Sequence, residues 1–275
     1  MGIDVPTLTF LLIESKKRQL GNVVTLGRQR IDLPPYWLKR LLRSEDDCTS
    51  EGYCENLLIA KLGAYSVESI DNSGYEGATH IFDLNKTLPA ASKYDTVIDA
   101  GTLEHVFNVP QALLNVSTLC ADRGRILHIL PANNYCGHGF WQFSPELFFS
   151  LYSEKNGYSD TRIFLVSLDD WDTWYECVKP NGSRGEFRSI GRAPLLIMAA
   201  TTKSGAFSHQ DVQQSDYIAA WNADEESNYR PTGFREKIKN TAWWPLARRV
   251  DYALRALKAP SEDFMIRRQV SSLLS

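Results

Sequence analysis

Residues 94–105, YDTVIDAGTLEH, and residues 124–134, GRILHILPANN, decide the fold of this chain. Each stretch contains a short apolar run that stops abruptly in small and polar residues, as buried strands do. Between them, residues 106–120 carry apolar side chains at the spacing of one helix face. We therefore expect a right-handed strand–helix–strand crossover. Both polar clusters should open onto the carboxyl edge of a parallel sheet, where ligands bind in such folds.

The rest of the chain repeats this alternation of strand and helix patterns. Short strand-like runs at residues 22–26, 65–70 and 78–82 each stop at a glycine or an acid, with helical patterns between them. This predicts an α/β fold with a doubly wound, mostly parallel, Rossmann-like sheet. Three later runs at residues 161–168, 171–178 and 195–201 follow, and the loop between the last two favours an antiparallel return over a helical crossover.

The C-terminal quarter has a different composition. Residues 203–230 are polar and weakly periodic, which predicts a linker, and residues 234–270 are basic and include the pair Trp243 and Trp244. We expect an α/β domain over residues 1–202 and a linker with a basic helical extension over residues 203–275. The extension could lie on an anionic bilayer, or it could be a helix packed on its own domain with a solvated basic face.

Composition excludes several classes of protein. The 275 residues are 43% hydrophobic, enough for a full core, and the net charge of −3 gives no pull toward nucleic acid. The five cysteines are scattered with no CxxC pair, which favours reduced cytosolic thiols and no metal site. No signal peptide and no apolar run of about 18 residues is found, so a cytoplasmic protein without a membrane span is expected.

Two acids that end strands point to a nucleoside. Asp71 closes the second expected strand and Asp83 the third, and a carboxylate at the second position can accept hydrogen bonds from ribose hydroxyls. Either acid could instead cap a turn. The turn after the first strand, Leu26 to Gln29, has the single glycine Gly27, so a pyrophosphate has no close backbone cradle. A ligand with a nucleoside and a carboxylate would not need one. Arg28 could meet that carboxylate, or it could be an exposed arginine in a turn.

These residues together resemble a family. The strand order, the two acids and above all YDTVIDAGTLEHV are similar to class I S-adenosylmethionine-dependent methyltransferases of the "methyltransferase type 11" group, over roughly residues 22–131. The resemblance implies a seven-stranded sheet that ends in an antiparallel hairpin. The chain departs from the family in its first motif, where TLGRQ replaces ExGxGxG, and in an insertion that contains Pro34, Pro35 and Trp37.

The resemblance also implies roles for individual residues. Leu26, Gly27, Arg28 and Gln29 would face the methionine part of S-adenosylmethionine, and Asp71 would hold its ribose. The remaining cofactor positions would be Asp83 and Leu84 beside the adenine, and Asp99 and Gly101 beneath the methionine amine.

The segment after the fifth strand supplies candidates for acceptor chemistry. His138 lies between two glycines and is the leading general-base candidate, with His105 second. A lone histidine is more often a structural hydrogen-bonding residue, which is the alternative for both. Amides and aromatic rings in the same segment resemble a carbohydrate-binding surface, and the substrate-binding candidates are Asn133, Asn134, Tyr135 and Gln142. The same aromatic residues would fit a buried helix start.

Three functions follow from these patterns. The first is O-methylation, dependent on S-adenosylmethionine, of a sugar, a polysaccharide precursor or a natural-product hydroxyl, with a small-molecule or glycan acceptor. The second is a non-catalytic module that keeps the fold and has lost the cofactor. A nicotinamide-dependent reductase or epimerase is disfavoured because the glycine fingerprint is missing. The sequence does not indicate an oligomeric state.

Overall fold

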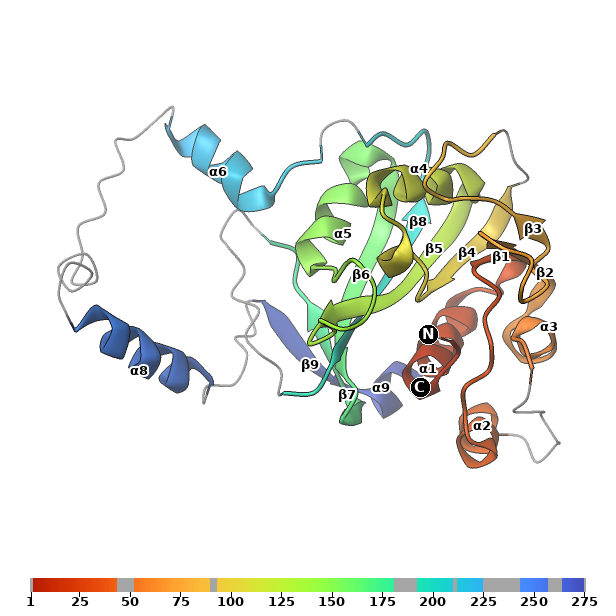
Figure 1. Cartoon of the computed structure of the whole chain (residues 1–275), viewed down its shortest axis with the longest axis horizontal. Helices are drawn as coiled ribbons and strands as arrows, with labels where there is room; N and C mark the ends of the chain where they lie inside the picture. The colour runs from red at the N-terminus through yellow and green to blue at the C-terminus, as the bar shows by residue number, and fades with distance from the viewer. Residues whose placement is uncertain are drawn as a thin grey trace.

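A computed structural model describes residues 2–43, 52–89, 93–180, 192–209, 212–224, 243–256 and 264–274. These residues form one sheet in the order β3-β2-β1-β4-β5-β8-β6-β7-β9, with helices on both faces (Figure 1). One half of the sheet is parallel and consists of β1 (Gly21–Leu26), β2 (Ala64–Asp71), β3 (His80–Ile81), β4 (Tyr94–Ala100) and β5 (Cys120–Asn133). The other half is antiparallel and consists of β6 (Tyr158–Ser167), β7 (Asp170–Cys177), β8 (Leu195–Lys203) and β9 (Met265–Gln269).

This topology confirms the predicted fold class. The order β3-β2-β1-β4-β5 is doubly wound, and β8 inserts antiparallel between β5 and β6, as the seven-stranded methyltransferase type requires. Two further strands, β7 and β9, extend the antiparallel edge. The third strand is shorter than its sequence pattern predicts, because only two residues pair with β2 before the chain turns at Asp83.

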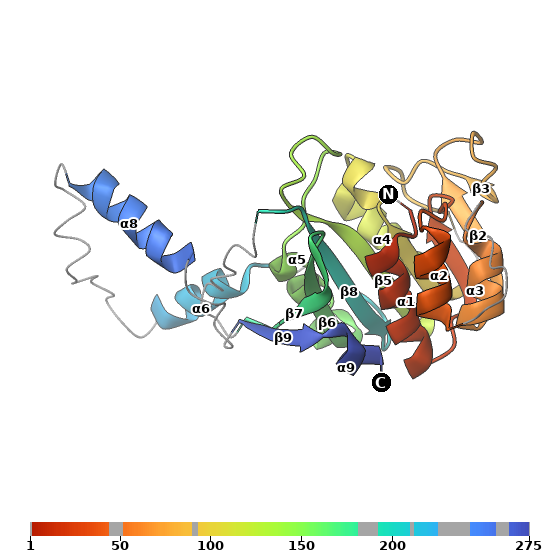
Figure 2. The ribbon, with the colours of Figure 1, turned by 90° about the horizontal axis from the view of Figure 1, so that it is seen from below.

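Helices cover the two faces of the sheet and create two separate cores (Figures 1 and 2). One face is covered by α1 (Val5–Lys17), α2 (Pro35–Leu42), α3 (Glu55–Leu62) and the short α9 (Val270–Leu274). The other is covered by α4 (Val109–Leu119) and α5 (Pro145–Leu151). Because both faces are covered, nearly all residues of β4 are buried, whereas a strand covered on one face would bury only every second residue.

The C-terminal region differs from its sequence pattern in two places. The predicted linker contains the helix α6 (Ser215–Asp224), and the predicted helical tail contains β9 as well as the helix α8 (Trp244–Ala256). β9 pairs antiparallel with β7, so the end of the chain returns to the sheet. A strand of five residues with alternating burial, MIRRQ, is too short and too charged to be recognised by its pattern. The acidic, polar composition of residues 44–51 predicts a surface loop, and these residues lie outside the described ranges.

Within the described ranges, we find no helix with both the length and the apolar character needed to cross a membrane.

Candidate functional site

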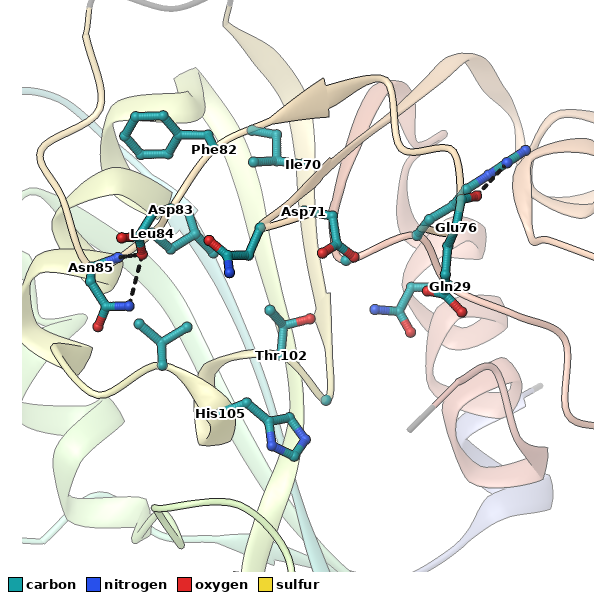
Figure 3. A pocket seen from close by; sticks show the side chains of 15 residues that line it. Gln29, Ile70, Asp71, Glu76, Phe82, Asp83, Leu84, Asn85, Thr102 and His105 are labelled. Atoms are coloured by element: carbon teal, nitrogen blue, oxygen red, sulfur yellow. Dashed lines mark hydrogen bonds between the residues drawn. The ribbon is translucent and has the colours of Figure 1, made fainter. Parts of the chain in front are cut away.

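A cavity of about 500 Å³ opens at the carboxyl ends of β1, β2 and β4, the edge that the sequence predicts for a ligand (Figure 3). The strands end level with one another, since Leu26 is paired with Ile70 on one side and with Asp99 on the other. The cavity is lined by Gly27, Arg28, Gln29, Ile70, Asp71, Asn72, Glu76, Phe82, Asp83, Leu84, Asn85, Gly101, Thr102, His105 and Val106.

The turn after β1 keeps the floor of this cavity open. Gly27 has φ of +66°, and a Cβ there would lie 2.9 Å from Thr102 Oγ1 and 3.3 Å from Gln29 Nε2. A side chain would therefore be strained and would crowd the site. Gln29 is almost fully buried and donates its Nε2 to Leu26 O at 2.6 Å. Its Oε1 has no hydrogen-bond partner within the described part of the chain, so it can accept from a ligand.

The two strand-closing acids have different local roles. Asp71 Oδ1 accepts a bond from Ser73 N at 3.2 Å, and its Oδ2 lies on the side of the Gly27 turn. Asp83 Oδ1 accepts bonds from the side chain and the backbone of Asn85, and these bonds lower the pKa of the Asp83 carboxyl. Asp83 thus caps a turn and lines the cavity at the same time (Figure 3).

The Arg28 guanidinium is already engaged by the protein. Its Nε donates to Glu55 at 2.6 Å, its Nη1 donates to Glu76 O at 2.8 Å, and its plane lies 3.9 Å from the centre of the Tyr53 ring. The sequence left two roles open for Arg28. The prediction that it is an exposed arginine in a turn is wrong, because its side chain is a fixed part of the cavity wall. Its ion pair with Glu55 also reduces its capacity to bind a ligand carboxylate.

Two residues predicted to bind the cofactor do not line the cavity. Leu26 is fully buried, and its carbonyl oxygen accepts from Gln29 and Thr102. Asp99 is also fully buried: its Oδ2 binds His128 Nδ1 at 2.8 Å, and its Oδ1 accepts from the amides of Thr102 and Leu103. The Asp99 carboxylate is therefore a scaffold for the next turn and is not available to a methionine amine.

The charges around the cavity favour a cationic ligand. Three acids, Asp71, Glu76 and Asp83, line it against the single cation Arg28, which is itself paired. A pyrophosphate would meet net repulsion here and would find no glycine-rich cradle. A ligand that carries positive charge and hydroxyl donors suits this wall of acceptors.

The structure brings the two predicted base candidates together beside an acid. The rings of His105 and His138 lie 4.9 Å apart between centroids, and both Nε2 atoms approach Glu104 Oε1, at 3.7 Å for His105 and 3.4 Å for His138. His105 and Glu104 belong to the 3-10 turn η1 (Leu103–His105), whereas His138 comes from the loop after β5. His105 also lines the cavity, so this three-residue cluster adjoins the cofactor-sized space.

Burial shifts the pKa values in the cluster. It raises the pKa of the Glu104 carboxyl to about 7, and the nearby negative charge of Asp99 acts in the same direction. Burial also lowers the pKa of His105, and repulsion from His138 adds to this. Such shifts are common at functional sites.

The predicted acceptor-binding amides mainly hold the loop that carries His138. Asn134 donates to the carbonyls of Arg192 and Ala193, and Gln142 Oε1 accepts from the amide of Tyr135 at 3.0 Å. Asn133 is exposed at the end of β5. Only Tyr135 faces the cluster, with its ring centroid 5.9 Å from that of His138.

The aromatic residues of this loop divide between core and surface. Phe143 is buried in the core beside α5, whereas Phe140 is 67% exposed and Trp141 is 42% exposed. Phe140 meets the exposed ring of Phe107 edge to face, at 6.1 Å between centroids. The sequence pattern did not predict Phe107, Phe82, Thr102 or Glu104 as site residues. Glu104 lies inside the LEHV motif, so its position next to His105 was the available signal.

No protein-family model matches the chain, and no curated protein matches it. Among solved structures, the chain is similar to the N-methyltransferase NodS from Bradyrhizobium japonicum WM9, with 11% identity, a TM-score of 0.39, and 72% of this chain and 94% of that chain covered. It is also similar to a 1,6-didemethyltoxoflavin-N1-methyltransferase from Burkholderia thailandensis, with 15% identity, a TM-score of 0.40 and coverages of 73% and 79%. The plantazolicin methyltransferase BpumL, in complex with SAH, has 11% identity, a TM-score of 0.38 and coverages of 73% and 82%. These three proteins are methyltransferases by name. The fold assignment of this chain rests on its own strand order.

Proposed function

We propose that this chain is an S-adenosylmethionine-dependent methyltransferase that methylates a hydroxyl of a sugar, a polysaccharide precursor or a natural product. The observation that carries the proposal is the acid-lined cavity at the tips of β1, β2 and β4, which adjoins a cluster of two histidines. When bound, the cofactor would supply a methyl group on a sulfonium and be left as S-adenosylhomocysteine, and a histidine of this cluster would take the proton that the acceptor hydroxyl loses.

The cavity walls fit this cofactor. Asp71 would accept bonds from the ribose hydroxyls, and the unpartnered Gln29 Oε1 would accept from the ammonium group. Phe82 and Leu84 offer apolar surface to the adenine, next to the turn that Asp83 caps. The volume of about 500 Å³ lies within the range of roughly 300–1,000 Å³ that is usual for small-ligand pockets.

The acceptor would enter beside the histidines. His105 and His138 would activate its hydroxyl as general bases. The ring of Tyr135 lies beside His138 and would border the path by which the acceptor approaches that histidine. The exposed faces of Phe140 and Trp141, with Phe107 beside them, offer a surface on which a sugar ring or another planar acceptor can stack. A screen of nucleotide sugars, glycans and phenols with labelled S-adenosylmethionine tests this acceptor class. Transfer confined to proteins or small amines would refute it.

Titration calorimetry with S-adenosylhomocysteine tests the cofactor. We expect binding by the wild-type chain and none of NADH. Asp71→Asn should weaken binding by roughly 10–100-fold, because it removes the charge from an acceptor of ribose hydrogen bonds. The matched control is Asp122→Asn, whose side chain is 85% exposed at the start of β5, and it should bind like wild type.

The same titration separates the enzyme from a non-catalytic module. The engagement of Arg28 by Glu55 and the replacement of the acidic first motif favour the module. If S-adenosylhomocysteine does not bind, or if Asp71→Asn binds it as well as wild type does, the module replaces the enzyme as the better proposal.

The helix α8 supports peripheral contact with an anionic membrane at the cytoplasmic face. Leu246 and Val250 are 54% and 51% exposed, and their spacing of four places them on one side of the helix; Trp243, directly before the helix, is 71% exposed. Arg248 and Arg249 are exposed on the same helix and carry charge that anionic headgroups attract.

Vesicle sedimentation tests this contact. We expect the wild-type chain to pellet with vesicles that contain phosphatidylserine, and the variant W243A/L246A/V250A to stay in solution, because its apolar anchor is gone. The control variant I59A/Y65A removes exposed apolar side chains elsewhere, on α3 and β2, and should pellet like wild type. Equal pelleting of all three proteins would show that α8 does not make the contact. Deletion of the whole tail is unsuitable, since it would also remove β9.

A further inference from the structure

In the part of the chain that the structure describes, the Glu104 carboxyl group is buried without a hydrogen bond to either of its oxygens. Its side chain has no solvent exposure, and neither Oε1 nor Oε2 makes a hydrogen bond to any described residue. Burial of a polar group without a hydrogen-bond partner is unfavourable, and more so if the group is charged. His138 Nε2 is likewise buried and without a hydrogen bond to the described residues. These two atoms lie 3.4 Å apart, so one ligand placed between them could bind both.

The three side chains have the geometry of a metal-binding group. One donor atom each from Glu104, His105 and His138 lies within 4.8 Å of the other two, and the two nitrogens are 3.7 and 3.4 Å from Glu104 Oε1. Bonds of 2.0–2.2 Å to a tetrahedral ion place neighbouring ligand atoms roughly 3.3–3.6 Å apart. The distance to His138 falls within that spacing and the distance to His105 lies just above it, so binding would need only small side-chain movements.

The backbone holds the three residues in register. The amides of Phe140 and Trp141 both donate to Glu104 O, at 2.7 and 3.3 Å, and so fasten the His138 loop to the η1 turn. Gly139 has φ of +71°, and a Cβ there would lie 2.7 Å from that same carbonyl oxygen. Only a glycine permits this close approach, which is the approach that carries His138 toward Glu104.

We propose that Glu104, His105 and His138 bind one divalent transition-metal ion, at the side of the cavity where the acceptor would enter. Two histidines and one carboxylate leave the remaining coordination positions open, and an acceptor oxygen can occupy one of them. With their nitrogens bound to the ion, the two histidines would act on the hydroxyl through it and not as free bases: the ion would orient the hydroxyl and favour loss of its proton. This role deepens the proposed function and rests on it. Binding of the ion itself does not depend on methyl transfer.

Titration calorimetry with Zn²⁺, on protein first stripped with a chelator, tests the site. We expect one ion per chain and a rise in the thermal midpoint with Zn²⁺. Glu104→Gln, His105→Ala and His138→Ala should each weaken binding by about 100-fold or more, since loss of even a supporting partner costs 10–100-fold. The control is His80→Ala, because His80 forms a 2.7 Å pair with Glu68 but belongs to no three-ligand group in the described residues.

A second measurement distinguishes loss of a metal ligand from loss of the folded structure. In the metal-free state, Glu104→Gln should unfold at a temperature no lower than wild type, because the amide costs less to bury than the carboxylate. Its failure to bind Zn²⁺ then reports the loss of a ligand. Zn²⁺ binding that is absent in wild type, or unchanged in all three variants, would overturn the inference.

The outcome is separable from that of the proposed function. S-adenosylhomocysteine is titrated into the same stripped protein. If it binds while Zn²⁺ does not, the metal inference fails and the methyltransferase proposal stands. If Zn²⁺ binds through the three residues while S-adenosylhomocysteine does not, the metal site stands without that function.

Discussion

Asp99→Ala is expected to lower the free energy of unfolding by about 3–5 kcal/mol, because it leaves several buried hydrogen-bond donors without their acceptor. The donors are His128 Nδ1, at 2.8 Å from Asp99 Oδ2, and the amides of Thr102 and Leu103, at 3.1 and 3.3 Å from Oδ1. Asp99, His128 and Tyr152 are all buried, so water cannot replace the lost acceptor. Urea denaturation of the ligand-free protein measures the change.

Asp95→Ala on the same strand is the matched control. The Asp95 carboxylate also accepts two hydrogen bonds, from the amide and the side chain of Asn22, but it does so at the surface. The cost should stay near 1 kcal/mol or below, because the freed donors turn to water. If Asp99→Ala and Asp95→Ala destabilise the protein equally, the buried network has no special part in stability.

The bond from Asp99 to His128 also has a defined direction. A carboxylate can only accept, so the His128 proton lies on Nδ1, and in the neutral ring Nε2 accepts from the Tyr152 hydroxyl at 2.7 Å. The other oxygen of Asp99 holds the first residues of the turn that carries Glu104 and His105. The network thus connects the sheet core to the candidate site, and Asp99 is a positioning residue.

Local patterns in the sequence were sufficient for the parallel half of the fold. β1, β2 and β4 end where apolar runs meet a glycine or an acid. The signal for each strand end therefore lies within a few consecutive residues. Because parallel strands end at one edge, the gathering of Gly27, Asp71, Asp83 and Gly101 around one cavity followed from strand order alone.

Contacts between distant segments could not be read in the same way. His138 and Glu104 meet because Gly139 allows a loop to lie against a turn 35 residues earlier in the chain, and no periodicity records that contact. The sequence does not reveal that Asp99 is buried, for a similar reason. An acid at a strand tip reads as a ligand-binding group until the partner strand is known, and here β5 supplies His128 opposite it.

Arg162→Met should cost about 3–5 kcal/mol of unfolding free energy, by leaving the Glu14 carboxylate buried without its main partner. The Glu14 side chain has no solvent exposure, and the Arg162 guanidinium grips both of its oxygens at 2.9 Å, which joins α1 to β6. Lys17 also reaches Glu14 at 3.2 Å, but its side chain is 47% exposed. Lys17→Ala, measured in the same urea titration, should therefore cost no more than about 1 kcal/mol.

The double variant E14M/R162M tests the physical cause. If the cost of Arg162→Met comes from an uncompensated buried charge, removal of that charge should restore most of the stability, although two polar residues are now lost. A double variant that is as unstable as the sum of Glu14→Met and Arg162→Met would mean that the pair acts through packing alone. We expect recovery, because a methionine at each position keeps most of the side-chain volume and the buried carboxylate that Arg162 neutralised is gone.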